Sequence, residues 1–303
     1  MNLFDKLIVS SLPFVPKPVV RRFAARYVAG ETLEDATRVM QELAAEGAMA
    51  TLDVLGESVT RAEQTAATRD EYLRALDAIH AASLPANVSV KPTAVGLAID
   101  PLLARENCAA ICAKAAEKGT FVRLDMEDSP FTEPTIRLAL DLKSEFQNVG
   151  VVIQAYLRRS LGDLDRLIAA RMNVRICKGI YVEPRRIAYK DRQTIVRNFG
   201  ALVDKHLSAR CYAGIATHDE ACVQLALATI DRLGLGRDDY EFQMLLGVDP
   251  LLRRVLIESG HRLRVYVPYG RDWYAYSVRR LKENPSIARH VVSRVLGLGP
   301  SAT

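Results

Sequence analysis

The sequence predicts an α/β protein whose strands close into a (β/α)8 TIM barrel. Eight short runs of apolar or β-branched residues recur along the chain, and stretches with helical periodicity separate them. Strands that alternate with helices form a parallel sheet, because two parallel neighbours need a crossover connection. Eight such units in roughly 250 residues match the count and size of this barrel.

The competing architecture is a doubly wound open sheet with a dinucleotide site after its first strand. That site needs a glycine-rich turn in which the backbone approaches the phosphates. The corresponding segment here, residues 55–58, contains one glycine, Gly56. The barrel is therefore the favoured fold.

The pattern along the chain divides it into two regions. Residues 1–46 are predicted to form an N-terminal helical segment, because apolar residues recur at helical spacing over 19–27 and 33–45. Residues 47–303 are predicted to form the barrel. Its strands are expected at 50–55, 88–90, 121–124, 149–155, 174–177, 212–216, 240–245 and 263–267. Its helices are expected at 70–82, 102–118, 132–146, 161–170, 194–209, 220–233 and 250–259.

The composition is that of a soluble globular protein, with 49% hydrophobic and 25% charged residues. A net charge of +5 without a run of five like charges argues against a nucleic-acid partner. The five cysteines match no zinc spacing, so we expect reduced thiols, no metal site and a cytoplasmic location. Residues 7–15 are apolar but too short to span a membrane. A bilayer surface could still be contacted by Leu3, Phe4, Leu7, Ile8, Leu12 and Phe14, although a helix that caps the domain is the favoured interpretation.

Polar residues gather where the predicted strands end. Catalytic residues of this barrel lie at the carboxyl ends of its strands, and the amino ends here are poorer in strong hydrogen-bonding groups. This asymmetry predicts one active face. The polar groups at the strand ends are Asp53, Glu57, Lys91, Asp125, Glu127, Asp128, Gln154, Arg175, Lys178, Thr217, His218, Asp219, Gln243, Tyr266 and Tyr269.

Asp125 is predicted to point into the barrel or its mouth, on the same side as Arg123 and Glu127. A carboxylate there needs a cation, and Lys91 and Arg175 are the candidates. A closed salt-bridge network inside the barrel is the purely structural alternative. Lys91 could instead form a Schiff base, as in a barrel aldolase, if apolar surroundings lowered its pKa.

The segment 175–181 is poorly suited to core packing alone. Arg175 and Lys178 place two cations near a strand end, Gly179 lets the backbone approach a ligand, and Tyr181 adds a phenol ring. These features suit a planar electron-rich cofactor or an anionic substrate. His218 follows another strand and is interpreted as a hydrogen-bond partner of a cofactor, or as a core histidine held by Asp219.

A helix that starts near residue 272 carries a second cluster of functional groups. Tyr276, Arg279, Arg280 and Glu283 fall within about a 100° arc of that helix. Arginine forks suit carboxylates geometrically, so this face is a candidate site for an anion. A solvated Arg–Glu surface is the alternative.

Together these stretches resemble the proline dehydrogenases, FAD-dependent enzymes that oxidise L-proline to 1-pyrroline-5-carboxylate. The patterns Arg-x-x-Lys-Gly-x-Tyr at 175–181 and Tyr-x-x-Arg-Arg-x-x-Glu at 276–283 carry most of the resemblance. Further matching stretches lie, in the family's order, at 90–92, 124–127, 154–156, 216–219 and 241–245. The chain looks like the short monofunctional bacterial type, without an aldehyde dehydrogenase domain.

The resemblance implies a distorted (β/α)8 barrel whose final helix lies over the mouth. It implies catalytic roles for Asp125 and Arg175, with Arg175 beside flavin N5. The implied substrate-binding residues are Lys91, Tyr181, Leu245, Tyr266, Tyr276, Arg279 and Arg280. The implied FAD-binding residues are Met126, Gln154, Arg175, Lys178, Gly179, Ile180, Thr217 and His218.

The resemblance also implies a reaction and its partners. Hydride would pass from C5 of proline to flavin N5, as the first step of proline degradation to glutamate. Electrons would then pass to a membrane quinone, which would give the apolar N-terminal helix a use in peripheral contact with the inner face of the membrane.

Overall fold

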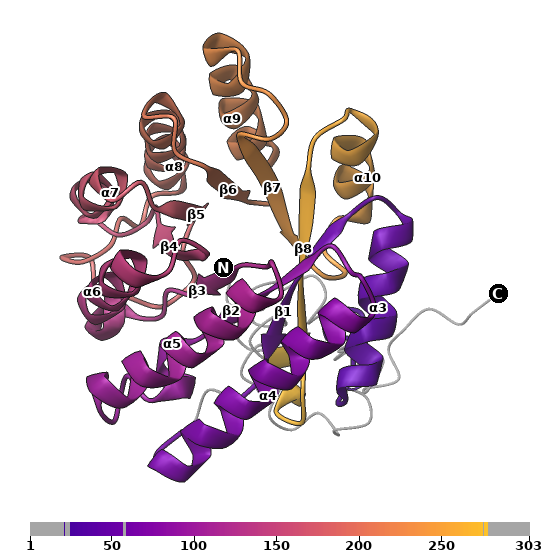
Figure 1. The fold of residues 1–303 in the computed structure, drawn as a ribbon. Coiled ribbons are helices and arrows are strands. Elements are labelled where there is room, and N and C mark those ends of the chain that lie inside the picture. Colours follow the sequence, from indigo (N-terminus) through magenta and orange to yellow (C-terminus); the bar gives the residue numbers. More distant parts are fainter. Residues whose placement is uncertain (1–20, 22–24, 57–58, 275, 278–303) are drawn as a thin grey trace, which may run out of the picture.

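The computed structural model describes residues 21, 25–56, 59–274, 276 and 277. Within this part, eight parallel strands pair in sequence order and close into one barrel, and β8 pairs with β1 (Figure 1). The predicted fold class is confirmed. The strands are β1 (Met49–Val54), β2 (Ala86–Val90), β3 (Val122–Leu124), β4 (Val149–Gln154), β5 (Asn173–Cys177), β6 (Ala213–Ala216), β7 (Tyr240–Leu245) and β8 (Leu263–Tyr269).

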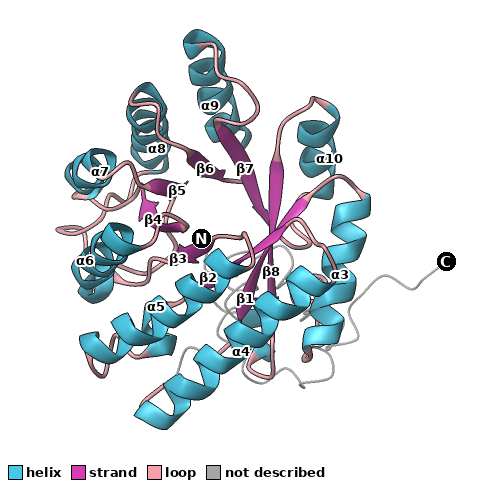
Figure 2. Ribbon diagram, viewed as in Figure 1, coloured by secondary structure: helices cyan, strands magenta, loops and turns pink. Residues whose placement is uncertain are grey.

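Helices surround the barrel, as Figure 2 shows. They are α3 (Leu33–Ala45), α4 (Ala62–Ala81), α5 (Pro101–Glu117), α6 (Ser129–Glu145), α7 (Ser160–Ala169), α8 (Arg192–Ser208), α9 (Glu220–Leu233) and α10 (Pro250–Glu258). Several begin at a side chain that caps the free backbone N–H groups of the first turn, including Thr32, Asp100, Asp191, Asp219 and Asp249. Ala36, Met40 and Leu43 of α3 are buried in the same core as the strands, so this helix is packed as part of the barrel.

The structure departs most clearly from the predicted elements in three places. α4 begins at Ala62, earlier than predicted. The prediction missed its first two turns because they lack a continuous apolar stripe. A short 3-10 helix, η2 (Pro92–Val95), follows β2 and was not predicted. Most of the helix predicted at 19–27 lies outside the described residues, but Ala25, Arg26 and Tyr27 form a turn, so no helix reaches Tyr27.

Polar side chains fill much of the barrel interior. Barrels of this type are usually filled by bulky branched side chains, whereas here apolar side chains such as Leu52 and Val88 pack with the helices in the main core. Arg123 is 2% exposed and donates to the backbone oxygens of Val151 (3.1 Å) and Asn173 (2.7 Å). Buried polar groups are stable when they are hydrogen-bonded, and these two bonds hold Arg123 in place inside the barrel.

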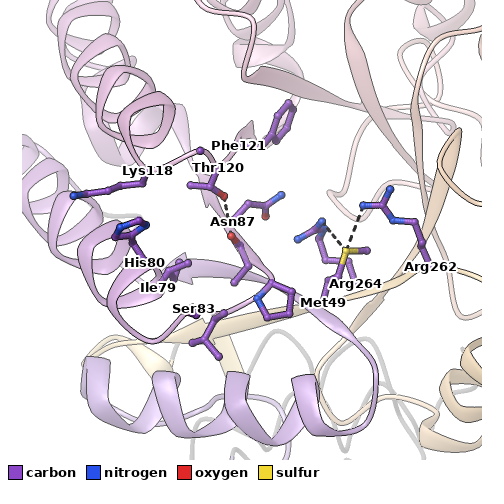
Figure 3. Close-up of a pocket in the computed structure, with 14 residues that line it drawn as sticks. Met49, Ile79, His80, Ser83, Asn87, Lys118, Thr120, Phe121, Arg262 and Arg264 are labelled. Carbon is purple, nitrogen blue, oxygen red and sulfur yellow. Dashed lines mark hydrogen bonds between the residues drawn. The ribbon is translucent and has the colours of Figure 1, made fainter.

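A cavity of about 570 Å³ opens at the amino ends of the strands, opposite the mouth (Figure 3). Arg262 and Arg264 line it, and their Nη2 atoms lie 3.7 and 3.3 Å from the sulfur of Met49. This end of such barrels contributes to stability rather than to catalysis.

None of the described helices is both long and apolar enough to cross a bilayer. Among the described residues, no three His, Cys, Asp or Glu side chains gather into a group that could hold a metal ion.

Candidate active site

The larger cavity, of about 1090 Å³, lies at the carboxyl ends of the strands. Every predicted site residue that the structure describes lines it. These are Lys91, Asp125, Met126, Gln154, Arg175, Lys178, Gly179, Ile180, Tyr181, Thr217, His218, Leu245, Tyr266 and Tyr276. Arg279 and Arg280 lie outside the described residues. Side chains from seven of the eight barrel strands, or the loops that follow them, therefore converge on one space, as a parallel barrel requires.

Asp125 accepts hydrogen bonds from three neighbours at the base of this cavity. Arg175 Nη1 and Ser89 Oγ lie 2.7 and 2.6 Å from Oδ1. The hydroxyl of Tyr266 donates to Oδ2 at 2.8 Å. Asp125 is 8% exposed, and one guanidinium and two hydroxyl donors fix its carboxylate in place.

Lys91 pairs with Asp53 and not with Asp125. Of the two cations predicted to pair with Asp125, Lys91 is therefore corrected. Its Nζ lies 2.5 and 2.6 Å from the two carboxylate oxygens, and Asp53 is fully buried. Asp125 takes the other predicted partner, Arg175. An ion pair of this kind keeps the lysine charged, which opposes the Schiff-base alternative, since that chemistry needs a neutral amine.

Tyr266 connects the two ion pairs. Its hydroxyl lies 3.5 Å from Lys91 Nζ as well as 2.8 Å from Asp125, and its ring lies 5.5 Å from the guanidinium carbon of Arg175. Burial raises its pKa well above 10, and the charges of Asp125 and Asp53 raise it further. The phenol therefore stays protonated and acts as a donor at neutral pH.

Basic groups lie together at one rim of the cavity. Lys178 and Arg192 both contact Asp219 Oδ2, at 2.8 and 3.0 Å. Asp219 also caps α9 by accepting from the N–H of Ala221. Lys178 and Arg192 thus place two cations at this rim, where Asp219 and Glu220 also line the cavity. The N–H groups of the two cations suit an anionic ligand group.

The structure gives a reason for glycine at position 179 that the sequence did not predict. Its φ is +98°, and a Cβ built there would lie 2.1 Å from Cδ1 of Tyr156. Glycine is therefore required by its backbone conformation and by the Tyr156 ring. Gly179 also lines the cavity, so the close approach of its backbone to a ligand stays a prediction beside this structural requirement.

His218, Thr217 and Gln154 are held by neighbouring backbone groups. His218 Nε2 accepts from the N–H of Leu245 at 2.8 Å, so the imidazole orients a cavity wall. The Asp219 carboxylate, its predicted partner in a structural role, is instead used by Lys178 and Arg192. Thr217 Oγ1 accepts from the N–H of Asp219 at 3.0 Å, and Gln154 Nε2 donates to the Glu127 carbonyl at 2.9 Å.

Two further residues, one lining the cavity and one buried beneath it, were not singled out by the sequence patterns. Tyr27 comes from the N-terminal region and packs with Tyr276 and Leu55, and no motif marks it. Ser89 holds Asp125 and Arg175. Its position two residues before Lys91 on a strand is the signal that could have found it, because alternate residues share a face.

Comparison with known proteins points to one family. The proline dehydrogenase family model matches residues 36–293. A proline dehydrogenase of Deinococcus radiodurans is 41% identical over 278 residues, which cover 90% of each chain. Proline dehydrogenase 1 of Bacillus subtilis (strain 168) is 34% identical over 273 residues, again 90% of each chain.

The solved structures agree on the fold. Proline utilization A (PutA) from Bdellovibrio bacteriovorus, crystallised after inactivation by N-propargylglycine, superposes with a TM-score of 0.81 at 24% identity. The match covers 86% of this chain and 32% of that longer chain. The family model spans most of the sequence, and two relatives exceed 30% identity over nearly their full length. The chain belongs to the proline dehydrogenase family.

Proposed function

We propose that the chain is an FAD-dependent dehydrogenase that oxidises L-proline to 1-pyrroline-5-carboxylate. The observation that carries this proposal is the pair of buried ion pairs, Asp125–Arg175 and Asp53–Lys91, held side by side by Tyr266 beneath one large cavity. An amino acid brings both a carboxylate and an amine, and this floor offers fixed groups of both signs.

The residues present fit a flavin dinucleotide. The cavity of about 1090 Å³ is larger than most small-molecule sites. Apolar side chains such as Val152, Met126 and Met244 line it and suit a flat ring system, and the Lys178–Arg192 rim suits a pyrophosphate. Gln154, Gly179, Ile180, Thr217 and His218 would complete the cofactor site. The bound flavin would supply the hydride acceptor, N5.

The remaining lining residues would hold proline. Lys91, with Arg279 and Arg280, would bind the carboxylate, and Tyr181, Leu245, Tyr266 and Tyr276 would enclose the ring. Fixing the carboxylate orients C5, and such positioning supplies a large share of catalysis. Arg175 would place a positive charge beside the flavin, which favours its reduced state. Hydride loss needs a neutral amine, so the rate should rise with pH.

We further propose that the electrons pass to a membrane quinone, with the protein at the inner face of the membrane. Of the N-terminal region 1–46, α3 packs in the core of the barrel region 47–303, and the part before α3 would cover the cavity. Tyr27 supports this role, because it lines the cavity and packs on Tyr276.

Substitution of the proposed carboxylate clamp tests the proposal. Lys91→Met, Arg279→Met and Arg280→Met should each raise the KM for L-proline about 10- to 100-fold, the value of one charge-assisted hydrogen bond. Arg137→Met, at an exposed cation on α6, should leave KM unchanged. An unchanged KM in all three clamp variants would show that proline binds elsewhere.

A further inference from the structure

Arg175 is held by hydrogen bonds on two sides of its guanidinium group. Nη1 donates to Asp125 Oδ1 at 2.7 Å and to Ser89 Oγ at 3.1 Å. Nε donates to Oε1 of Gln243, a β7 residue that is 5% exposed and lines the cavity. Within the described residues, no acceptor lies on Nη2, so this nitrogen is the one left for a ligand.

The orientation of the Gln243 amide is decided by Glu241, two residues earlier on β7. Gln243 Nε2 donates to Glu241 Oε1 at 2.5 Å. An ionised carboxylate can only accept, so the amide must turn its NH2 toward Glu241 and its oxygen toward Arg175. Gly214 leaves room for this amide, because a Cβ there would lie 2.6 Å from Nε2.

Glu241 is itself held ionised. Burial alone would raise its pKa, but the charge and hydrogen bonds of Arg264 and the amide of Gln243 lower it to about 2. Arg264 Nε and Nη2 lie 2.7 and 3.0 Å from its two oxygens, and the Tyr212 hydroxyl donates at 3.0 Å. Arg264 and Tyr212 therefore fix the Glu241 carboxylate in place.

We propose that Glu241 and Gln243 are positioning residues that fix the plane of the Arg175 guanidinium. This inference rests on the proposed function, in which Arg175 faces the flavin. Glu241 sets the direction of the amide, Gln243 sets the direction of Nε, and Nη2 is thereby aimed at the cofactor. Neither residue touches the reacting atoms, so their effect passes through Arg175.

Gln243→Met tests the proposal, because methionine fills similar space but cannot accept from Arg175 Nε. We expect a lower midpoint potential of bound FAD, since a loosened guanidinium stabilises the reduced flavin less well. We also expect flavin reduction at saturating L-proline to slow about tenfold with little change in KM. Gln193→Met is the matched control, because it removes the same kind of Arg–Gln hydrogen bond, from Arg197 Nη2 at 3.4 Å, at an exposed position of α8 that does not line the cavity. It should change neither value.

A double-mutant cycle with Arg175→Met separates positioning from general structural support. Gln243→Met should have no further effect on the potential once Arg175 is absent. An equal shift in both backgrounds, or no shift in wild-type background, would overturn the inference. Gln243→Asn, whose shorter amide cannot span both partners, gives the same readout if Gln243→Met does not fold. A wild-type protein whose flavin L-proline does not reduce would instead refute the proposed function.

Discussion

At the residue scale, the structure explains why a particular residue type or ion-pair partner is needed, which a sequence motif does not reveal. Gly179 belongs to a stretch typical of the family, yet its neighbour in the structure is the Tyr156 ring. The choice of ion-pair partners is a similar case. Lys91 and Arg175 were both candidates for Asp125, and only the three-dimensional arrangement assigns Lys91 to Asp53.

Gly179→Ala should destabilise the protein by about 3 kcal/mol or more. The loss combines a φ of +98° with a clash against Tyr156. Gly119→Ala is the matched control, because its φ is +66° and nothing lies within 4 Å of the added Cβ. That variant should lose only about 1 kcal/mol. Urea unfolding measures both, and equal losses would mean that the Tyr156 contact imposes no cost.

At the element scale, helix N-termini couple the scaffold to the cavity. Asp219 caps α9 and also holds Lys178 and Arg192. Asp219→Asn and Asp219→Ala both lose the ion pairs, but only alanine removes the cap. Asp219→Ala should therefore be about 1 kcal/mol less stable than Asp219→Asn in urea.

The α5 cap provides the control for this comparison. Asp100 caps α5 through the N–H of Leu102 at 2.9 Å and does not line the active cavity. Asp100→Ala should likewise be about 1 kcal/mol less stable than Asp100→Asn, because only alanine removes the cap. Asp100 variants of equal stability would mean that a difference between the Asp219 variants does not come from capping.

Element types could be predicted from the sequence because each strand is a short run rich in apolar or β-branched residues, set between stretches of helical periodicity. All eight strands lie where such runs occur, although β2 begins at Ala86, before the predicted start. The first turns of α4 could not be predicted, since residues 62–69 mix alanine with polar groups and lack periodicity. At the site, strand-end residues were predictable from topology. Tyr27 was not, because it reaches the cavity through tertiary packing alone.

At the scale of the whole molecule, stability should depend on pH through a buried histidine. His206 is fully buried, and its Nε2 lies 3.0 Å from the Tyr212 carbonyl. Burial lowers its pKa to about 4. The unfolded chain therefore binds a proton first, and stability falls as the pH drops from about 6.5 toward 4.

Between pH 7.5 and 4.5 this residue should cost roughly 2.5 kcal/mol of unfolding free energy. Urea unfolding at the two pH values measures the loss. The pKa of Glu241 is about 2, so its contribution persists over this range. The pKa of His261 is also lowered by burial, and His206→Gln separates the two. An undiminished pH dependence in His206→Gln would assign the effect elsewhere.

We propose that one large cavity holds both a flavin and L-proline. The visible absorbance spectrum of the purified protein during anaerobic addition of proline tests this most directly. We expect a flavin spectrum that L-proline bleaches and D-proline leaves unchanged, because the clamp and Arg175 would fix C5 of one enantiomer over N5. A protein that binds no flavin, or whose flavin stays oxidised with L-proline, would contradict it.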